Sequence, residues 1–418
     1  MKLASLGCLV GSLLFAGSQD SDLNVNRRYI VDSVSVSGRG WRSDVVEPSE
    51  KFSNGLRKDM LALVGQKLNP GILDELATRL KKELSARDVT HHIVRSEVPD
   101  HIRVEFEVRQ ASMGITANLT KLLYNSKQGW SGGGMVGVTA RQNTFLVGLI
   151  SDGDTLNERF AGINARYENK HLGTDRLGFR VDVESYHDQW NHYTTDALAS
   201  NPGVTGDAYR TRQTFAPMLS ITLAKPLTLE VGAAFERFGS PVSEGVTEGA
   251  NAVVTSLRYH RRLTESDFQQ EIYADYSLRA ATRLLDSDFV FASHLAGLHY
   301  RVGRGKHKIT EAVAVGAVTG RAPLSDRFVA GNGYYLRGWN KYDIDPIGGN
   351  RLAHNTVDYR YGPFQAFYDA GAVWDSGQPV NIRHSLGIGV RESVFALAMA
   401  FPLRSGHVEP VFMMGIIY

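Results

Sequence analysis

Apolar residues in the first quarter of the chain follow a helical period framed by strand-like segments. Between residues 53 and 87 they recur at spacings of three and four, with a break at Gly65, which predicts two amphipathic helices. Apolar and polar residues alternate over residues 29–38, 89–98 and 102–108, as in half-buried strands. The order strand, helix, helix, strand, strand predicts a small α+β unit in which two helices cover one face of a three-stranded sheet.

After residue 110 a period of two replaces the helical period. Leu177, Phe179 and Val181, for example, alternate with the charged Arg180 and Asp182. A secreted β-sandwich would also alternate, but the strand runs of about ten residues and the aromatic residues near strand ends favour a transmembrane antiparallel β-barrel. The 308 residues from 111 to 418 allow about 19 residues per strand for sixteen strands.

The N-terminal segment has the three parts of a secretory signal peptide. Met1-Lys2 precedes the apolar run from Leu3 to Phe15, and small residues follow up to Ser18. We therefore expect a signal peptide over residues 1–18, a short linker over 19–28, the α+β unit over 29–110 and the barrel over 111–418. Cys8 is the only cysteine, so the mature chain would have no disulfide and no thiolate metal site.

Composition excludes several classes of function. Lys and Arg number 46 against 44 Asp and Glu, so no overall basic field exists to attract nucleic acid. The one Gly-x-Ser-x-Gly match, Gly129 to Gly133, precedes no helical pattern, so we do not expect a nucleophile elbow there. For the same reason Ser131 to Gly134 is more typical of a flexible strand entry than of a phosphate loop. We expect no enzymatic activity, no cofactor and no metal site.

An ordered set of motifs near the C-terminal end is more specific than the strand pattern. It comprises Leu336-Arg337-Gly338-Trp339, then Phe367 to Gly371 with the spacing Phe-x-Asp-x-Gly, and a last strand with Gly415 and Tyr418. This set resembles the BamA/TamA superfamily of outer-membrane assembly and secretion barrels, whose loop motif is usually Val/Ile-Arg-Gly-Phe/Tyr. The predicted α+β unit is similar to that family's periplasmic POTRA module.

The resemblance implies that the sixth extracellular loop folds back into the barrel lumen. It would carry Arg337 to Asp369, by motif match, and to Asp358, at the usual position of a Glu. Alternation also places both acids on lumen positions, and the planar guanidinium suits a carboxylate. The alternative is that both acids only line a wet interior.

The resemblance further implies insertion, assembly or translocation of polypeptides at the outer membrane, with the POTRA module in the periplasm. The implied partners are unfolded outer-membrane or secreted polypeptides, outer-membrane lipid and accessory lipoproteins. A seam between the last strand, which carries the family's assembly signal, and a first strand beginning near Gly132 would open laterally. Family members commonly carry several POTRA modules, whereas the 92 residues from 19 to 110 have room for one. A dedicated two-partner-type secretion pore and a passive barrel plugged by the Arg337 loop stay open as alternatives.

Overall fold

The computed structural model of the chain describes residues 29–416, apart from residues 39, 48–50, 85, 111–112, 175, 202–203, 205–206, 243–244, 266–267, 333–334 and 407. The expected signal peptide, the linker, Cys8 and Tyr418 lie outside the described residues. Within this part of the chain, no helix is long and apolar enough to cross a membrane.

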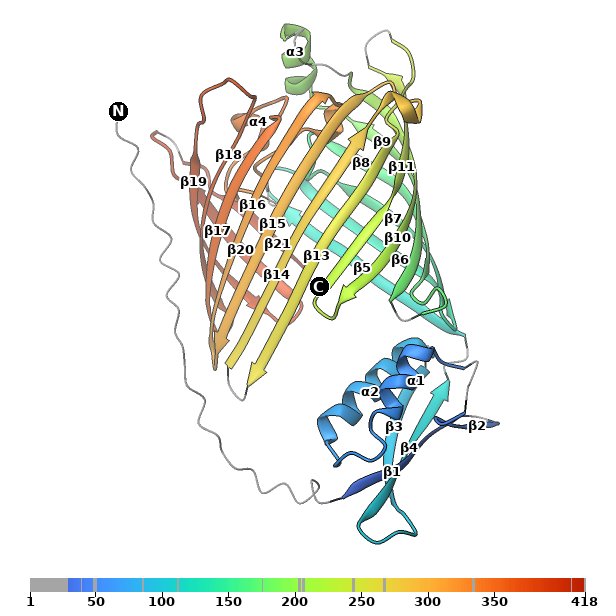
Figure 1. Ribbon diagram of the computed structural model, residues 1–418. Coiled ribbons are helices and arrows are strands. Elements are labelled where there is room, and N and C mark those ends of the chain that lie inside the picture. The colour runs from blue at the N-terminus through green and yellow to red at the C-terminus, as the bar shows by residue number, and fades with distance from the viewer. Residues whose placement is uncertain are drawn as a thin grey trace.

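The N-terminal unit is an α+β fold with a four-stranded sheet in the order β2-β1-β4-β3. Strands β1 and β4 are parallel, and the other two pairs are antiparallel. Two helices lie between the strands in the chain and cover the sheet (Figure 1). The bounds are β1 (Ile30–Gly38), β2 (Trp41–Asp44), α1 (Asn54–Leu61), α2 (Pro70–Glu83), β3 (Ala86–Arg95) and β4 (His101–Gln110).

The prediction of three strands in this unit is wrong by one strand. The missed strand, β2, has only four residues and returns directly after β1, pairing from Gly38↔Trp41 to Ser35↔Asp44. Four residues are too few to establish a period of two, so the sequence gives no usable signal for it.

Local sequence fixes where the two helices begin. The Ser53 hydroxyl accepts a hydrogen bond from the backbone N–H of Leu56, and Asn69 caps α2 in the same way ahead of Pro70. The apolar faces of the helices then pack on β1 and β4 in a single core. Its fully buried members include Leu56, Met60, Leu73, Leu80, Val36, Val104 and Phe106.

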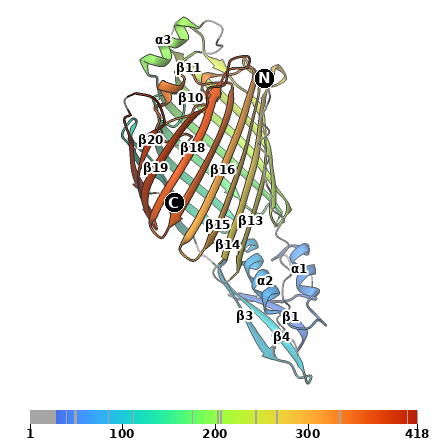
Figure 2. The same ribbon diagram turned by 90° about the vertical axis from the view of Figure 1, so that its left-hand side faces the viewer.

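The rest of the chain forms a closed antiparallel barrel, which confirms the predicted fold class. Strand β12 has two residues and pairs only with β11, and the remaining sixteen strands make the wall (Figures 1 and 2). The bounds are β5 (Gly114–Asn125), β6 (Gly129–Ala140), β7 (Asn143–Asp152), β8 (Arg159–Asn169), β9 (Leu177–Gln189), β10 (Tyr209–Ala224), β11 (Leu227–Pro241), β12 (Glu248–Gly249), β13 (Ala252–Glu265), β14 (Phe268–Ala281), β15 (Val290–Arg304), β16 (His307–Arg321), β17 (Arg351–Tyr361), β18 (Phe364–Trp374), β19 (Arg383–Glu392), β20 (Phe395–Pro402) and β21 (Val411–Ile416).

The first wall strand is β5, so the prediction of a first strand beginning near Gly132 is wrong. Gly132 lies inside β6, opposite Leu122 of β5. The glycine run Ser131 to Gly134 was predicted to be the entry to a strand. It lies within β6 instead, because the backbone hydrogen bonds of a sheet need no side chain.

The two ends of the barrel differ. The N-terminal unit lies below one end, where the β-turns are short, and the longer loops are at the other end (Figures 1 and 2). These loops carry α3 (His192–Ser200) and α4 (Lys341–Ile344). Two of them matter for the site: the second, residues 153–158, and the sixth, residues 322–350.

The outer surface of the wall is apolar. Large side chains such as Leu149, Val136 and Ile388 expose 62% to 69% of their area. A contiguous apolar surface of this kind is rare on soluble proteins and matches the lipid-facing band of a membrane barrel.

Candidate functional site in the barrel lumen

The structure brings Arg337 and Asp369 together inside the barrel. The sixth loop folds inward, and Asp369 Oδ2 accepts hydrogen bonds from both the backbone N–H and the Nε–H of Arg337, each at 2.9 Å. Arg337 Nη2 donates to Asp369 Oδ1 at 2.7 Å, which completes a bidentate pair. The Asp369 side chain is only 1% exposed, so this carboxylate depends on its partners for solvation.

Neighbouring strands complete the cage around the guanidinium. On β17, Thr356 Oγ1 accepts from Arg337 Nη2 at 2.7 Å, and Asp358 lies at 3.3 Å from Nη1. Asp358 also accepts from Gln365 Nε2 at 2.6 Å, so it is shared between loop and wall. The Phe367 ring lies 3.6 Å from the guanidinium carbon and adds a cation–π contact.

The other residues of the loop motif fit tight positions. Leu336 is fully buried, and both Leu336 and Gly338 have positive φ angles. A Cβ on Gly338 would lie 3.2 Å from the Ala400 backbone of β20, so the loop backbone packs directly on that strand. Trp339 Nε1 donates to the carbonyl of His384 on β19 at 2.8 Å.

Two predicted glycines have different surroundings. Gly415 lies opposite Leu123 of β5, and a Cβ there would lie 2.3 Å from the Leu122 carbonyl oxygen. Gly371 has its nearest neighbour, the Ala353 carbonyl, at 3.2 Å, which a small shift could relieve. The close approach at Gly415 therefore requires glycine more strictly.

Other contacts of the sixth loop were missed by the sequence analysis. Near the start of the loop, Arg327 Nη2 donates to both carboxylate oxygens of Asp375 at 2.8 and 2.9 Å. One residue earlier, Asp326 accepts from Arg279 of β14 at 2.9 Å. These charged residues match no motif, and their partners are distant in sequence, so no local pattern could have paired them.

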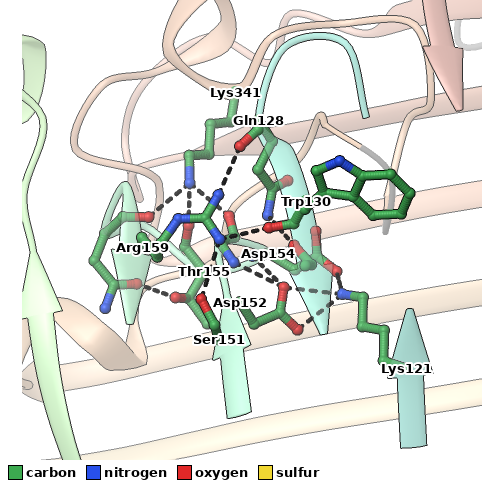
Figure 3. A network of polar contacts seen from close by, with 12 residues as sticks. Lys121, Gln128, Trp130, Ser151, Asp152, Asp154, Thr155, Arg159 and Lys341 are labelled. Carbon is green, nitrogen blue, oxygen red and sulfur yellow. Dashed lines mark hydrogen bonds and ion pairs between the residues drawn. The ribbon is translucent and has the colours of Figure 1, made fainter. Parts of the chain in front are cut away.

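A buried lysine makes the most enclosed contact of this loop. Lys341 is 2% exposed, and its Nζ donates to the backbone carbonyls of Gly153, Thr155 and Asn157, each at 2.7 Å. Burial lowers the pKa of Lys341 to about 8, and the nearby carboxylates oppose this shift. The side chain is therefore protonated at neutral pH and can donate all three hydrogen bonds. Figure 3 shows this network.

The barrel closes through a short seam. Among the described residues, which end at Ile416, four pairs join β21 to β5, from Met413↔Asn125 to Ile416↔Leu122. Six pairs join β20 to β21 and fifteen join β15 to β16. In the described part of the chain, β5 continues from Lys121 back to Gly114 with no β21 partner on this edge.

No cluster of three or more His, Cys, Asp or Glu that could hold a metal ion occurs in the described ranges. The polar groups that hydrogen-bond Arg337 also bond one another or the wall, as in a structural anchor.

Comparison with known proteins gives the family. The Omp85 superfamily domain matches residues 101–394, and no curated protein sequence matches the chain. Among solved structures, BamA from Haemophilus ducreyi lacking POTRA domains 1–3 has a TM-score of 0.60 at 13% identity, covering 93% of this chain and 85% of that chain. CdiB from Acinetobacter baumannii has a TM-score of 0.53 at 12% identity, with 94% and 74% covered, and CdiB from Escherichia coli has 0.56 at 10%, with 93% and 76% covered. At such identities these likenesses show the fold. The match of the family domain to most of the chain shows that the protein belongs to the Omp85 superfamily of outer-membrane β-barrels.

Proposed function

We propose that this protein inserts polypeptides into the outer membrane through the seam between β5 and β21. The observation that carries the proposal is the length of that seam, which in the described part of the chain has four residue pairs, whereas β20 and β21 have six and β15 and β16 have fifteen. Separating these strands sacrifices few hydrogen bonds and exposes two edges that can template an incoming strand. The substrates are unfolded outer-membrane polypeptides, and lipid surrounds the wall.

The sixth loop favours a lateral route over a central one. It is tied to the wall through Arg279, Arg327 and Arg337 and to the second loop through Lys341. A polypeptide leaving through the lumen would have to break all of these charge-assisted contacts, whereas a lateral exit can leave those of Arg279, Arg327 and Arg337 in place.

The N-terminal unit is the proposed POTRA module, in the periplasm below the barrel. It contacts the barrel turns through an ion pair of Glu75 with Lys225 and through Gln142, which donates to the Glu83 carbonyl at 2.7 Å. Its two edge strands, β2 and β3, can add an extended substrate strand by main-chain pairing. Accessory lipoproteins would bind this unit as well.

A reversible lock on the seam tests the proposal. Tyr124 and Met414 are paired across it, and the barrel sequence from residue 111 to 418 contains no cysteine. We expect cells that depend on a Tyr124→Cys/Met414→Cys variant to lose newly assembled outer-membrane proteins under oxidising conditions and to recover them with a reductant. The matched control places the pair at Val302 and Ile309, which face each other across β15 and β16. An outer-membrane proteome unchanged by the lock would overturn the proposal.

Two other functions predict different results. If the protein is a dedicated secretion pore, its depletion would stop the export of one protein and leave the outer-membrane proteome intact. If it is a passive barrel plugged by its sixth loop, depletion would change neither protein export nor the outer-membrane proteome. An inventory of the outer-membrane proteome after depletion therefore separates all three.

A further inference from the structure

Described residues of the sixth loop, at 332 and from 338 to 341, contact elements on both sides of the seam. On the side of the last strands, Gly338 packs on the Ala400 backbone of β20, and Trp339 donates to β19. On the side of the first strand, the Asn332 carbonyl accepts a hydrogen bond from Asn125 Nδ2. Asn125 is the residue of β5 that pairs with Met413 of β21.

The first-strand side is also reached through Lys341. The second loop presents three backbone carbonyls to the ammonium group of Lys341. The carboxylates beside these carbonyls bind a different lysine, which lies on β5. Lys121 Nζ donates to Asp152 Oδ1 and Oδ2 at 2.9 and 2.8 Å, and it also contacts Asp154 (Figure 3). The second loop thus lies between two lysines, one from the sixth loop and one from the first strand.

The loop that carries these three carbonyls is tightly packed. A Cβ on Gly153 would lie 2.5 Å from both Gln128 Nε2 and the Glu158 carbonyl oxygen, so this position accepts only glycine without rearrangement. Arg159, which directly follows the second loop, donates to the carbonyl of Gln128 at 2.8 Å and to Ser151 Oγ of β7 at 3.1 Å. Lys341 is therefore bound by three carbonyls of a tightly packed loop.

From this geometry we infer that Lys341 is a latch that holds the first strand of the barrel against the last one. The sixth loop acts as a strap, with Trp339 and Gly338 fastened to β19 and β20, and with Lys341 and Asn332 fastened to β5 and the loop beside it. Release of Lys341 frees β5 to move from β21 while Arg337 stays bound to Asp369. The inference rests on the proposed function, since it assigns a control point to the same seam.

Hydrogen exchange on the purified full chain, without substrate, tests the latch. We expect Lys341→Met, which keeps the length of the side chain and removes the charge, to speed amide exchange in residues 114–125 and 411–416 by about tenfold or more, as loss of charge-assisted hydrogen bonds predicts. Exchange in β17 and β18, which hold Arg337, should stay within about twofold of the original protein, since their ladders are untouched. Lys308→Met, in a wall strand away from this network, is the matched control and should leave the seam unchanged.

Two outcomes would overturn the inference. One is seam exchange in Lys341→Met equal to that in the Lys308→Met control. The other is an equal rise in every strand, because it would show that Lys341 only stabilises the barrel as a whole. If Lys341→Met does not fold, Asn125→Ala removes the other first-strand contact and must give the same seam-restricted rise. A latch confirmed in this way, with an outer-membrane proteome unaffected by the cysteine lock, would refute the proposed function and leave the latch standing.

Discussion

At the scale of single residues, the bidentate pair of Arg337 and Asp369 should be the contact whose loss destabilises the protein most. Replacing Asp369 with Asn leaves a buried guanidinium without its main counter-charge, so we expect the free energy of unfolding to fall by about 3 to 5 kcal/mol. Asp358→Asn is the matched control and should cost less, because its contacts with Arg337 are longer, at 3.3 and 3.5 Å. Urea unfolding of the lipid-refolded protein measures both variants. Equal losses would contradict the dominant role of Asp369.

A neighbouring glycine controls the ring that covers this arginine. A Cβ on Gly387 would lie 2.0 Å from Phe367 Cζ, so Gly387→Ala must displace the Phe367 ring from Arg337. We expect a loss of about 1 to 3 kcal/mol, as is usual for overpacking, and partial recovery when Phe367→Leu is added. Gly114→Ala, at a position with open space around it, should be nearly neutral in the same urea assay. A Gly387→Ala variant as stable as Gly114→Ala would show that the ring has room to move.

At the scale of elements, periodicity was enough for most of the fold and failed where segments are short or glycine-rich. Helices α1 and α2 carry regular apolar spacing, and long strands such as β9 alternate over much of their length, here from Leu177 to Glu184, so the sequence predicts them. Strand β2 is too short to show a period, and the glycines of β6 hide its alternation.

The contacts of the candidate site also divide into those that the sequence predicts and those that it does not. The Arg337 and Asp369 contact followed from a family motif, because the motif records which distant residues meet. The hydrogen bonds of Lys341 go to backbone carbonyls, which every residue carries, so no pattern of side chains could reveal them. The contacts of Arg327 and Arg279 depend on the register of strands far apart in the sequence.

The N-terminal unit has its own core, so it should unfold independently of the barrel. Leu73 of α2 is fully buried in that core, whereas the adjacent Ile72 is 41% exposed. We expect Leu73→Ala to lower the stability of the unit by about 2 to 5 kcal/mol through the cavity it leaves, and Ile72→Ala to cost much less. Calorimetry of the full chain in detergent should show the first transition shifted and the barrel transition unchanged. A shift of both transitions would mean that the two parts unfold together.

At the scale of the whole molecule, the sixth loop is held from several sides, which distinguishes a sealed barrel from an open pore. Arg327 anchors the loop near its start, Arg337 holds its middle on β17 and β18, and Lys341 fastens it to the second loop. Loss of one anchor leaves the others in place, so the lumen should stay blocked when Arg337 alone is changed.

Conductance across planar bilayers tests this redundancy. We expect Arg337→Ala to keep a low conductance close to that of the original protein, and Arg327→Ala/Arg337→Ala to raise it several-fold, because only the double change frees both the start and the middle of the loop. Arg166→Ala, which removes an ion pair with Asp182 elsewhere on the barrel wall, is the control for the loss of a wall arginine. A fully open channel in Arg337→Ala alone would mean that the other anchors do not hold the loop in the lumen. In that case the lumen would be as easily opened as the seam, and the preference for a lateral route would lose its physical basis.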